Sequence, residues 1–280
     1  MTSKRYFPLF AALLLLLLSQ SSTAAEKIKI STGHWPPYLN QALPENGFLA
    51  QIVSESFRNQ GYDVELVFLP WSRSLAMVKA GRYAASAVWS CTEARSREFL
   101  YSAPILPYQY VFYYRADEDF QWSSFDDLKG KSVGLTQDYS YGTTLSGTID
   151  SGLITADVTT SDLANFRKLL LGRIDLFPMD PVVGEAIIKN QLPARSFRLA
   201  FHPKPLRQAY YHLLFDKDSA KAPELRRAFN QGLAELRESG RYEAIIANAI
   251  AANSQPATAA MLRQKLVDFS GFVSICNPGD

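Results

Sequence analysis

Hydrophobic positions along the chain follow two spacings, one typical of strands and one typical of helices, which alternate along the sequence. Residues 28–30 and 64–68 have apolar side chains at every second position, which is typical of β-strands. Between them, residues 48–57 carry apolar side chains at helical spacing and Gly61 ends the run, and a second helical stretch follows over residues 71–81. This order predicts a βαβ unit in an α/β protein with a largely parallel sheet.

The same alternation returns further along the chain. The pattern predicts strands over residues 111–114, 132–135, 174–177 and 210–215, and helices over residues 163–170, 225–236 and 242–250. A chain of 280 residues is longer than one typical domain needs, so two lobes with strands crossing between them are expected. We assign residues 26–115 and 209–253 to the first lobe, residues 116–208 to the second lobe, and residues 254–280 to a C-terminal tail that either packs on the body as a helix or is a frayed end.

The N-terminal residues 1–25 have the pattern of an export signal. Lys4 and Arg5 precede the apolar run 7–18, and the small residues 22–25 suit cleavage by a signal peptidase. A membrane anchor, the alternative, needs about 20 apolar residues, and this run is shorter. We therefore expect a periplasmic protein that is not embedded in the membrane once the signal is removed.

Charge and composition exclude several classes of function. Removal of Lys4 and Arg5 takes the chain from 29 to 27 basic residues against 27 acidic ones, so nothing favours nucleic acid as a partner. Two cysteines and three histidines supply no zinc-binding spacing, and we expect no metal and no other cofactor. Whether Cys91 and Cys276 form a disulfide cannot be deduced from the sequence.

Several short motifs occur in an order that is similar to a known family. They are His34-Trp35-Pro36-Pro37-Tyr38, Thr92-Glu93-Ala94-Arg95, Ser102-Ala103-Pro104, the run 127–134, and Gly172-Arg173-Ile174-Asp175 followed by Asp180. Taken together over residues 27–251, they resemble the bacterial family 3 extracellular solute-binding proteins, the amino-acid receptors of ABC importers. The resemblance implies the type II periplasmic binding protein fold, in which each lobe is a mostly parallel sheet flanked by helices and two hinge strands join the lobes.

The resemblance also implies a site for a zwitterion. The family's arginine at the position of Arg95 binds the ligand carboxylate, which a planar guanidinium with two parallel donors can do, and Ser90 and Thr92 would donate to the same group. Asp180 matches the position that receives the amino group, across the cleft from Arg95. The structural alternatives are a surface arginine, capping of a loop by Ser90 and Thr92, and an N-cap of a helix by Asp180.

Aromatic residues complete the implied site. Trp35, Tyr38 and Trp71 would form a wall over the carbon chain of the ligand, although aromatic residues more often lie in the core. Tyr139 and Ser140 lie where the family has a Gly-Thr-Thr turn. Asp138 departs from the glycine of that turn, which puts a close approach of the backbone to the ligand in doubt.

The leading hypothesis is a non-catalytic, monomeric receptor that captures an amino-acid-like ligand for an ABC permease or a membrane sensor. The runner-up is an enzyme on the same fold, since the periplasmic cyclohexadienyl dehydratases are similar to family 3 receptors. The sequence shows no second acid or base beside Asp180 and no Ser-His-Asp order, so no catalytic residue is assigned.

Overall fold

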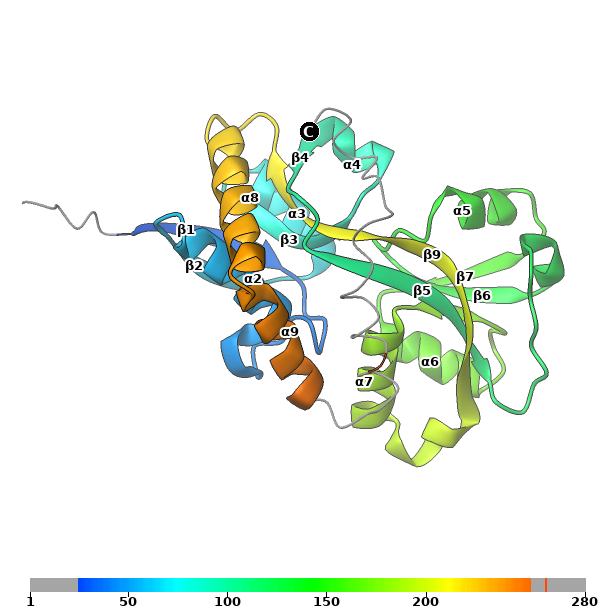
Figure 1. The fold of residues 1–280 in the computed structure, drawn as a ribbon. Helices are drawn as coiled ribbons and strands as arrows, with labels where there is room; N and C mark the ends of the chain where they lie inside the picture. The colour runs from blue at the N-terminus through cyan, green and yellow to red at the C-terminus, as the bar shows by residue number, and fades with distance from the viewer. Residues whose placement is uncertain (1–24, 253–259, 261–280) are drawn as a thin grey trace, which may run out of the picture.

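The computed structural model of the 280-residue chain describes residues 25–252 and residue 260. The sequence-based predictions for the export signal and for the C-terminal tail therefore lie outside the described residues, apart from Ala25 and the helical residue 260. The described part is a two-lobed α/β structure (Figure 1).

The first lobe is built on a parallel three-stranded core. β1 (Glu26–Thr32) lies between β2 (Tyr62–Phe68) and β3 (Ala85–Ser90), in parallel to both. The helices α2 (Phe48–Arg58), α3 (Trp71–Lys79) and α4 (Glu93–Glu98), together with the closing helices α8 (Ala222–Glu238) and α9 (Arg241–Ala252), belong to this lobe (Figure 1). The predicted βαβ unit is therefore present: α2 connects β1 to β2, and α3 connects β2 to β3.

Two long strands run from the first lobe into the second (Figure 1). β5 (Leu106–Arg115) and β9 (Leu199–Asp216) pair antiparallel, and β3 and the short β4 (Phe99–Tyr101) pair with β9 in the first lobe. The sequence predicted only residues 210–215 of β9, because Pro203 and Pro205 interrupt the strand pattern. The ladder accommodates them with register shifts around Val111.

The second lobe contains a smaller parallel pair and three helices. β6 (Ser132–Thr136) and β7 (Thr155–Thr159) are parallel, and the helices are α5 (Thr143–Asp150), α6 (Asp162–Leu170) and α7 (Pro181–Gln191). The strand predicted over residues 174–177 is displaced: β8 is Phe177–Met179, which pairs with β5, and Leu176 makes only an isolated bridge to Val133. Three short 3-10 helices, η1 (Pro44–Asn46), η2 (Phe125–Leu128) and η3 (Pro193–Arg198), lie in the connections.

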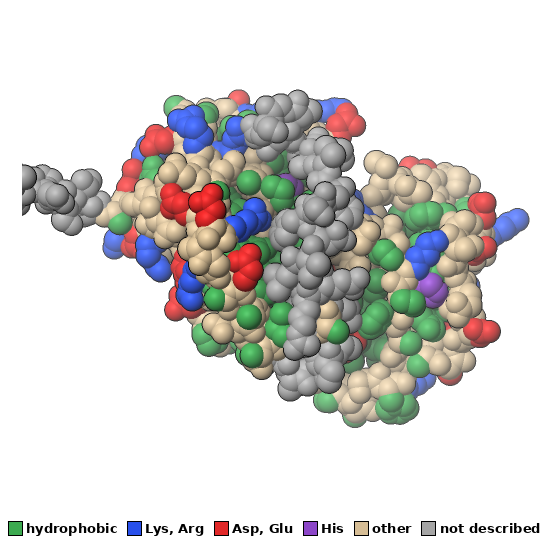
Figure 2. All heavy atoms as spheres, in the orientation of Figure 1, with side chains coloured by type: hydrophobic (Ala, Val, Ile, Leu, Met, Phe, Trp, Pro, Cys, Tyr) green, Lys and Arg blue, Asp and Glu red, His purple; other side chains and the backbone are tan. Residues whose placement is uncertain are grey.

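Close packing of α2 on α8 holds the first lobe together. A Cβ atom on Gly232 would lie 1.8 Å from the main-chain oxygen of Ser56, so only glycine lets the two helices approach this closely. Phe57 and Phe229, both fully buried, pack beside this contact with their ring centroids 5.3 Å apart. On the surface of this lobe, Lys and Arg side chains are interspersed with Asp and Glu (Figure 2). Within the described residues, no helix is long and apolar enough to span a membrane.

Candidate functional site

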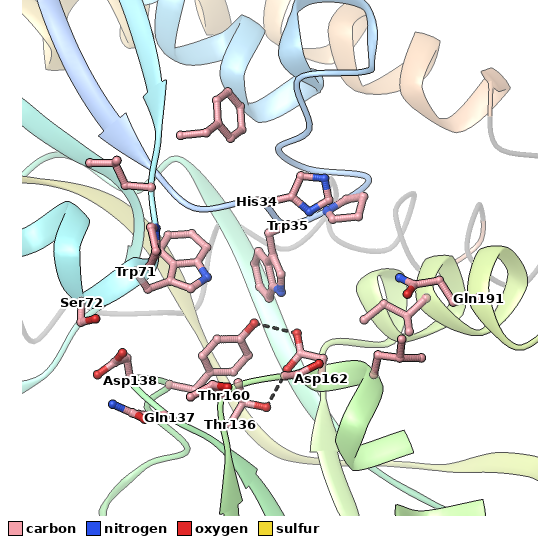
Figure 3. Close-up of a pocket in the computed structure, with 18 residues that line it drawn as sticks. His34, Trp35, Trp71, Ser72, Thr136, Gln137, Asp138, Thr160, Asp162 and Gln191 are labelled. Carbon is pink, nitrogen blue, oxygen red and sulfur yellow. Dashed lines mark hydrogen bonds between the residues drawn. The ribbon is translucent and has the colours of Figure 1, made fainter. Parts of the chain in front are cut away.

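A cavity of about 540 Å³ lies between the two lobes. Residues 34–36 and 68–72 of the first lobe and residues 136–139 and 160–163 of the second lobe line it, with Ile187 and Gln191. Most of these segments directly follow β1, β2, β6 and β7. Because parallel strands bring their carboxyl ends to one edge of a sheet, the sequence order itself gathers these residues at the cleft, where open α/β sheets bind ligands. Trp35 and Trp71 face Thr136, Asp138 and Asp162 across it (Figure 3).

A second, much smaller cavity of about 30 Å³ adjoins the first. The two share Trp35, Trp71, Asp138 and Tyr139 in their linings, and the smaller one is lined in addition by Val88, Trp89, Ser90, Arg95, Tyr110, Ser140 and Tyr211. This volume suffices for a water molecule and not for an amino acid. The lobes must therefore separate before a larger molecule can reach Arg95.

Arg95 is positioned by the start of α4. The hydroxyl of Thr92 caps the helix and accepts a hydrogen bond of 3.2 Å from the main-chain nitrogen of Arg95. The guanidinium lies 4.6 Å from the ring centre of Trp89 and donates to the main-chain oxygen of Ser90 at 3.1 Å and to that of Asp138, on the other lobe, at 2.7 Å. Burial lowers the pKa of Arg95.

The Arg95 guanidinium forms no ion pair with any described carboxylate, and its hydrogen-bond acceptors are main-chain oxygens and the Ser90 hydroxyl. A half-buried positive charge with neutral acceptors favours the arrival of an anionic group. The arrangement can therefore bind a carboxylate.

Asp138 adopts a backbone conformation that also suits the glycine found at this position in the family's turn. Its φ of 67° is in the left-handed region, which glycine adopts freely and aspartate adopts more readily than most other residues. The loop keeps the backbone shape of a glycine turn, and the carbonyl of Asp138 points at Arg95.

Arg207 makes interlobe contacts that the sequence reasoning missed, although it lines neither cavity. It lies on β9 and donates to the Ser140 hydroxyl at 2.9 Å and to the main-chain oxygen of Cys91 at 3.2 Å, so it connects the loops of the two lobes. No local motif marks it, because its partners are distant in sequence. Cys91 is disulfide-bonded, and Cys276 lies outside the described residues.

Aromatic rings line the boundary between the two cavities. The Trp35 ring makes edge-to-face contacts with two other rings. Its centroid lies 6.4 Å from that of Trp71 and 6.1 Å from that of Tyr139. Gly33 makes room for Trp71, since a Cβ atom there would lie 2.2 Å from the indole. The Trp35 Nε1 atom is buried and has no hydrogen-bond partner among the described residues, and the same holds for the Tyr211 hydroxyl.

Asp180 lies at the start of α7, where the sequence allowed either an N-cap or a ligand contact. It is fully buried, caps α7 by accepting from the Val182 nitrogen at 2.9 Å, and accepts from the Tyr38 hydroxyl of the other lobe at 3.2 Å. It lines neither cavity, and its charge contributes to the raised pKa values of Tyr110 and Tyr211, of which burial is the first cause. The N-cap alternative is thus present.

Asp162 is a second acid that sequence reasoning did not single out. It is the first residue of α6, accepts from the Thr136 hydroxyl at 2.6 Å and from the Tyr139 hydroxyl at 2.8 Å, and lines the large cavity (Figure 3). Burial raises the pKa of Asp162. Its place after Ser161 at a helix start is typical of ordinary capping, so no pattern in the sequence pointed to a role in the cleft.

The predicted site residues divide into two groups. Trp35, Trp71, Ser90, Arg95, Tyr139 and Ser140 all line the small cavity, whereas Tyr38, Thr92 and Asp180 do not. Among the described residues, no group of three His, Cys, Asp or Glu side chains could hold a metal ion.

The family model of the bacterial extracellular solute-binding proteins, family 3, matches residues 28–251. The chain belongs to this family. The two-lobed structure and the interlobe cavity are those expected for it.

Solved structures agree on the fold. A histidine kinase sensor domain with similarity to periplasmic binding proteins is 24% identical, with a TM-score of 0.68 over 80% of this chain and 96% of that one. A mutant of ArgBP from T. maritima is 20% identical (TM-score 0.65, 79% and 93% covered), and an ancestral arginine-binding protein bound to arginine is 18% identical (TM-score 0.67, 80% and 98% covered). No curated protein matches the chain. At these sequence identities, the comparisons with solved structures show only that the fold is shared.

Proposed function

We propose that this family 3 protein captures a small ligand with a carboxylate, an amino acid or a related zwitterion, between its two lobes. The observation that carries the proposal is the Arg95 guanidinium, which lies in the interlobe site without a carboxylate partner among the described residues. A ligand carboxylate would accept from the two terminal nitrogens of the guanidinium and from the Ser90 hydroxyl. The solved relatives of the same fold include proteins for arginine and for glutamate.

Binding then works by closure of the lobes. The contacts of Arg95 with Asp138, Trp35 with Tyr139, and Arg207 with Ser140 and Cys91 join the two sides in the present structure. A ligand that contacts both lobes favours the closed form by its differential affinity for that form. The hinge for this motion would be the paired strands β5 and β9.

For the amino group of the ligand we retain Asp180 as the receptor. In the closed structure the Tyr38 hydroxyl occupies its carboxylate oxygens. An ammonium would have to displace this hydroxyl from the Asp180 carboxylate. The sequence-based lobe assignment, with residues 116–208 as the second lobe, places Tyr38 and Asp180 on opposite sides.

The family places the protein in the periplasm or outside the cell. We propose a periplasmic monomer, exported by residues 1–25, that delivers its ligand to an ABC permease and performs no chemistry. A second candidate is a role in signalling, favoured by the similarity of fold to a histidine kinase sensor domain. Both roles use the same capture step and differ in the membrane partner.

A thermal-shift screen of the protein against amino acids, with the carboxyl amide of each as its matched control, tests the capture step. A bound ligand raises the melting temperature because it stabilises the folded state. We expect at least one amino acid to raise it and the corresponding amide not to. Equal shifts for an acid and its amide would contradict a carboxylate site at Arg95, and turnover of prephenate or arogenate would contradict the non-enzymatic role.

A further inference from the structure

The large cavity extends well beyond the space beside Arg95. Its volume is about 540 Å³ against about 30 Å³ for the small cavity, and the two meet at Trp35, Trp71, Asp138 and Tyr139. A ligand whose carboxylate is held at Arg95 therefore has its remaining chain directed past these residues into the large cavity. What lines that cavity decides which side chain the ligand carries.

The charged side chains that line the large cavity are acidic. Asp138 and Asp162 line it, and no Lys or Arg is among the described residues that do. His34 lies at its rim, where its imidazole bonds with the Asn40 side chain at 3.1 Å. The field inside the cavity thus favours a cation.

Asp162 is the less exposed member of this pair, since it is half-buried whereas Asp138 is exposed. Its two oxygens accept only from neutral hydroxyls, those of Thr136 and Tyr139, at 2.6 Å and 2.8 Å, and no described cation is paired with it. Burial of a carboxylate without a cation is unfavourable, which agrees with its raised pKa. An ammonium or guanidinium at this place would offset the loss of hydration.

A second observation points independently to a ligand here. Trp35 is 4% exposed, lies in the linings of both cavities, and has a buried Nε1 atom with no described hydrogen-bond partner. Buried indole N–H groups usually find an acceptor, so this donor is available to a polar atom of a ligand once the lobes separate. The rings of Trp35 and Trp71 also offer π-faces to a cation or its alkyl chain (Figure 3).

We propose that the ligand is an amino acid with a cationic side chain, whose ammonium or guanidinium group pairs with Asp162 in the large cavity. This inference rests on the proposed capture of the carboxylate by Arg95. Asp162 then selects for charge at the far end of the ligand, Arg95 selects for the carboxylate, and Trp35 and Trp71 contact the chain between them.

Calorimetric titration of the protein with two ligand pairs that differ in side-chain charge tests the proposal. Arginine is compared with citrulline, which replaces the guanidinium by a neutral urea, and lysine with norleucine. We expect the cationic member of at least one pair to bind tenfold or more tightly than its neutral counterpart, since a carboxylate makes a stronger hydrogen bond with a charged donor than with a neutral one. This comparison uses the wild-type protein and does not depend on a variant.

The Asp162→Asn variant assigns the selectivity to this residue. It should reduce the affinity for the cationic ligand to near that for the neutral one, while Asp150→Asn, an exposed acid at the end of α5, should change neither. Equal binding of both members of each pair, no binding of either cationic amino acid, or unchanged selectivity in Asp162→Asn would overturn the inference. If a neutral amino acid binds and its amide does not, the Arg95 proposal stands and only the Asp162 inference fails.

Discussion

Arg95 of the first lobe donates a hydrogen bond of 2.7 Å to the main-chain oxygen of Asp138 on the second lobe. The same guanidinium packs on Trp89 and contacts Ser90, so the side chain expected to hold the ligand also holds the lobes together. Closure and capture therefore share one residue. A ligand carboxylate that binds here gives the Arg95 guanidinium a charged acceptor, either in place of the Asp138 carbonyl or in addition to it. A charged acceptor makes a stronger hydrogen bond than a neutral one.

Gly33 is predicted to control the position of Trp71. Gly33→Ala places a methyl group where the indole now lies, 2.2 Å from its nearest atom, so the ring must move away. We expect a weaker affinity for the ligand, by tenfold or more, and a changed tryptophan emission spectrum in a protein that still folds. Gly147→Ala, where the added Cβ atom has no neighbour within 4 Å, is the control and should change neither property. An unchanged affinity in Gly33→Ala would remove Trp71 from the binding wall.

Gly232 is predicted to be essential for the contact between α2 and α8. Gly232→Ala brings a methyl group to 1.8 Å from the Ser56 carbonyl oxygen, which belongs to the backbone and cannot turn aside. We expect a loss of about 1–3 kcal/mol in the free energy of unfolding, measured in urea. Gly147→Ala, also within a helix, should instead gain up to about 1 kcal/mol, because alanine favours helix. A neutral Gly232→Ala would mean that the helices shift apart at little cost.

His212 is predicted to make the protein less stable in acid. It is 1% exposed, its Nδ1–H donates to the Ser102 oxygen at 2.8 Å, and burial lowers its pKa to about 4. The unfolded chain, with an ordinary histidine pKa of about 6.5, binds the proton first as the pH falls, so folding stability is lost between about pH 7 and pH 4. Over that range the wild type should lose about 3 kcal/mol relative to His212→Gln.

Urea unfolding of both proteins at a series of pH values measures this difference. Taking the difference between the two proteins removes the contribution of other titrating groups, including Asp162, whose raised pKa acts in the opposite direction. A constant difference from pH 7 to pH 4 would show that His212 titrates normally in the folded protein.

The sequence was a good guide wherever a pattern is local. The periodicity of residues 28–81 predicted β1, α2, β2 and α3, and the Thr92 to Arg95 spacing predicted an arginine that does lie in an interlobe cavity. The N-terminal part of β9, residues 199–209, was missed because two prolines interrupt the strand pattern there, and its pairing is set by β5, a distant segment.

Residues whose position depends on two distant segments could not be predicted. Arg207 meets Cys91 and Ser140 only because β9 passes between the lobes, and Asp162 meets Tyr139 only through the pairing of β6 with β7. Asp180 shows the opposite case. Its motif was recognised, yet the Tyr38 hydroxyl that now covers it comes from 142 positions away in the chain.

Calorimetry on Arg95→Ala and Arg97→Ala is the most direct test of the capture of a carboxylate by Arg95. Both arginines are on α4, but Arg97 is exposed and pairs with Glu93 at the surface, so it is a matched control. With the amino acid that gives the largest thermal shift, we expect Arg95→Ala to lose at least a hundredfold in affinity and Arg97→Ala to bind as the wild type does. Equal affinity in Arg95→Ala and the wild type, with both proteins folded, would contradict the account.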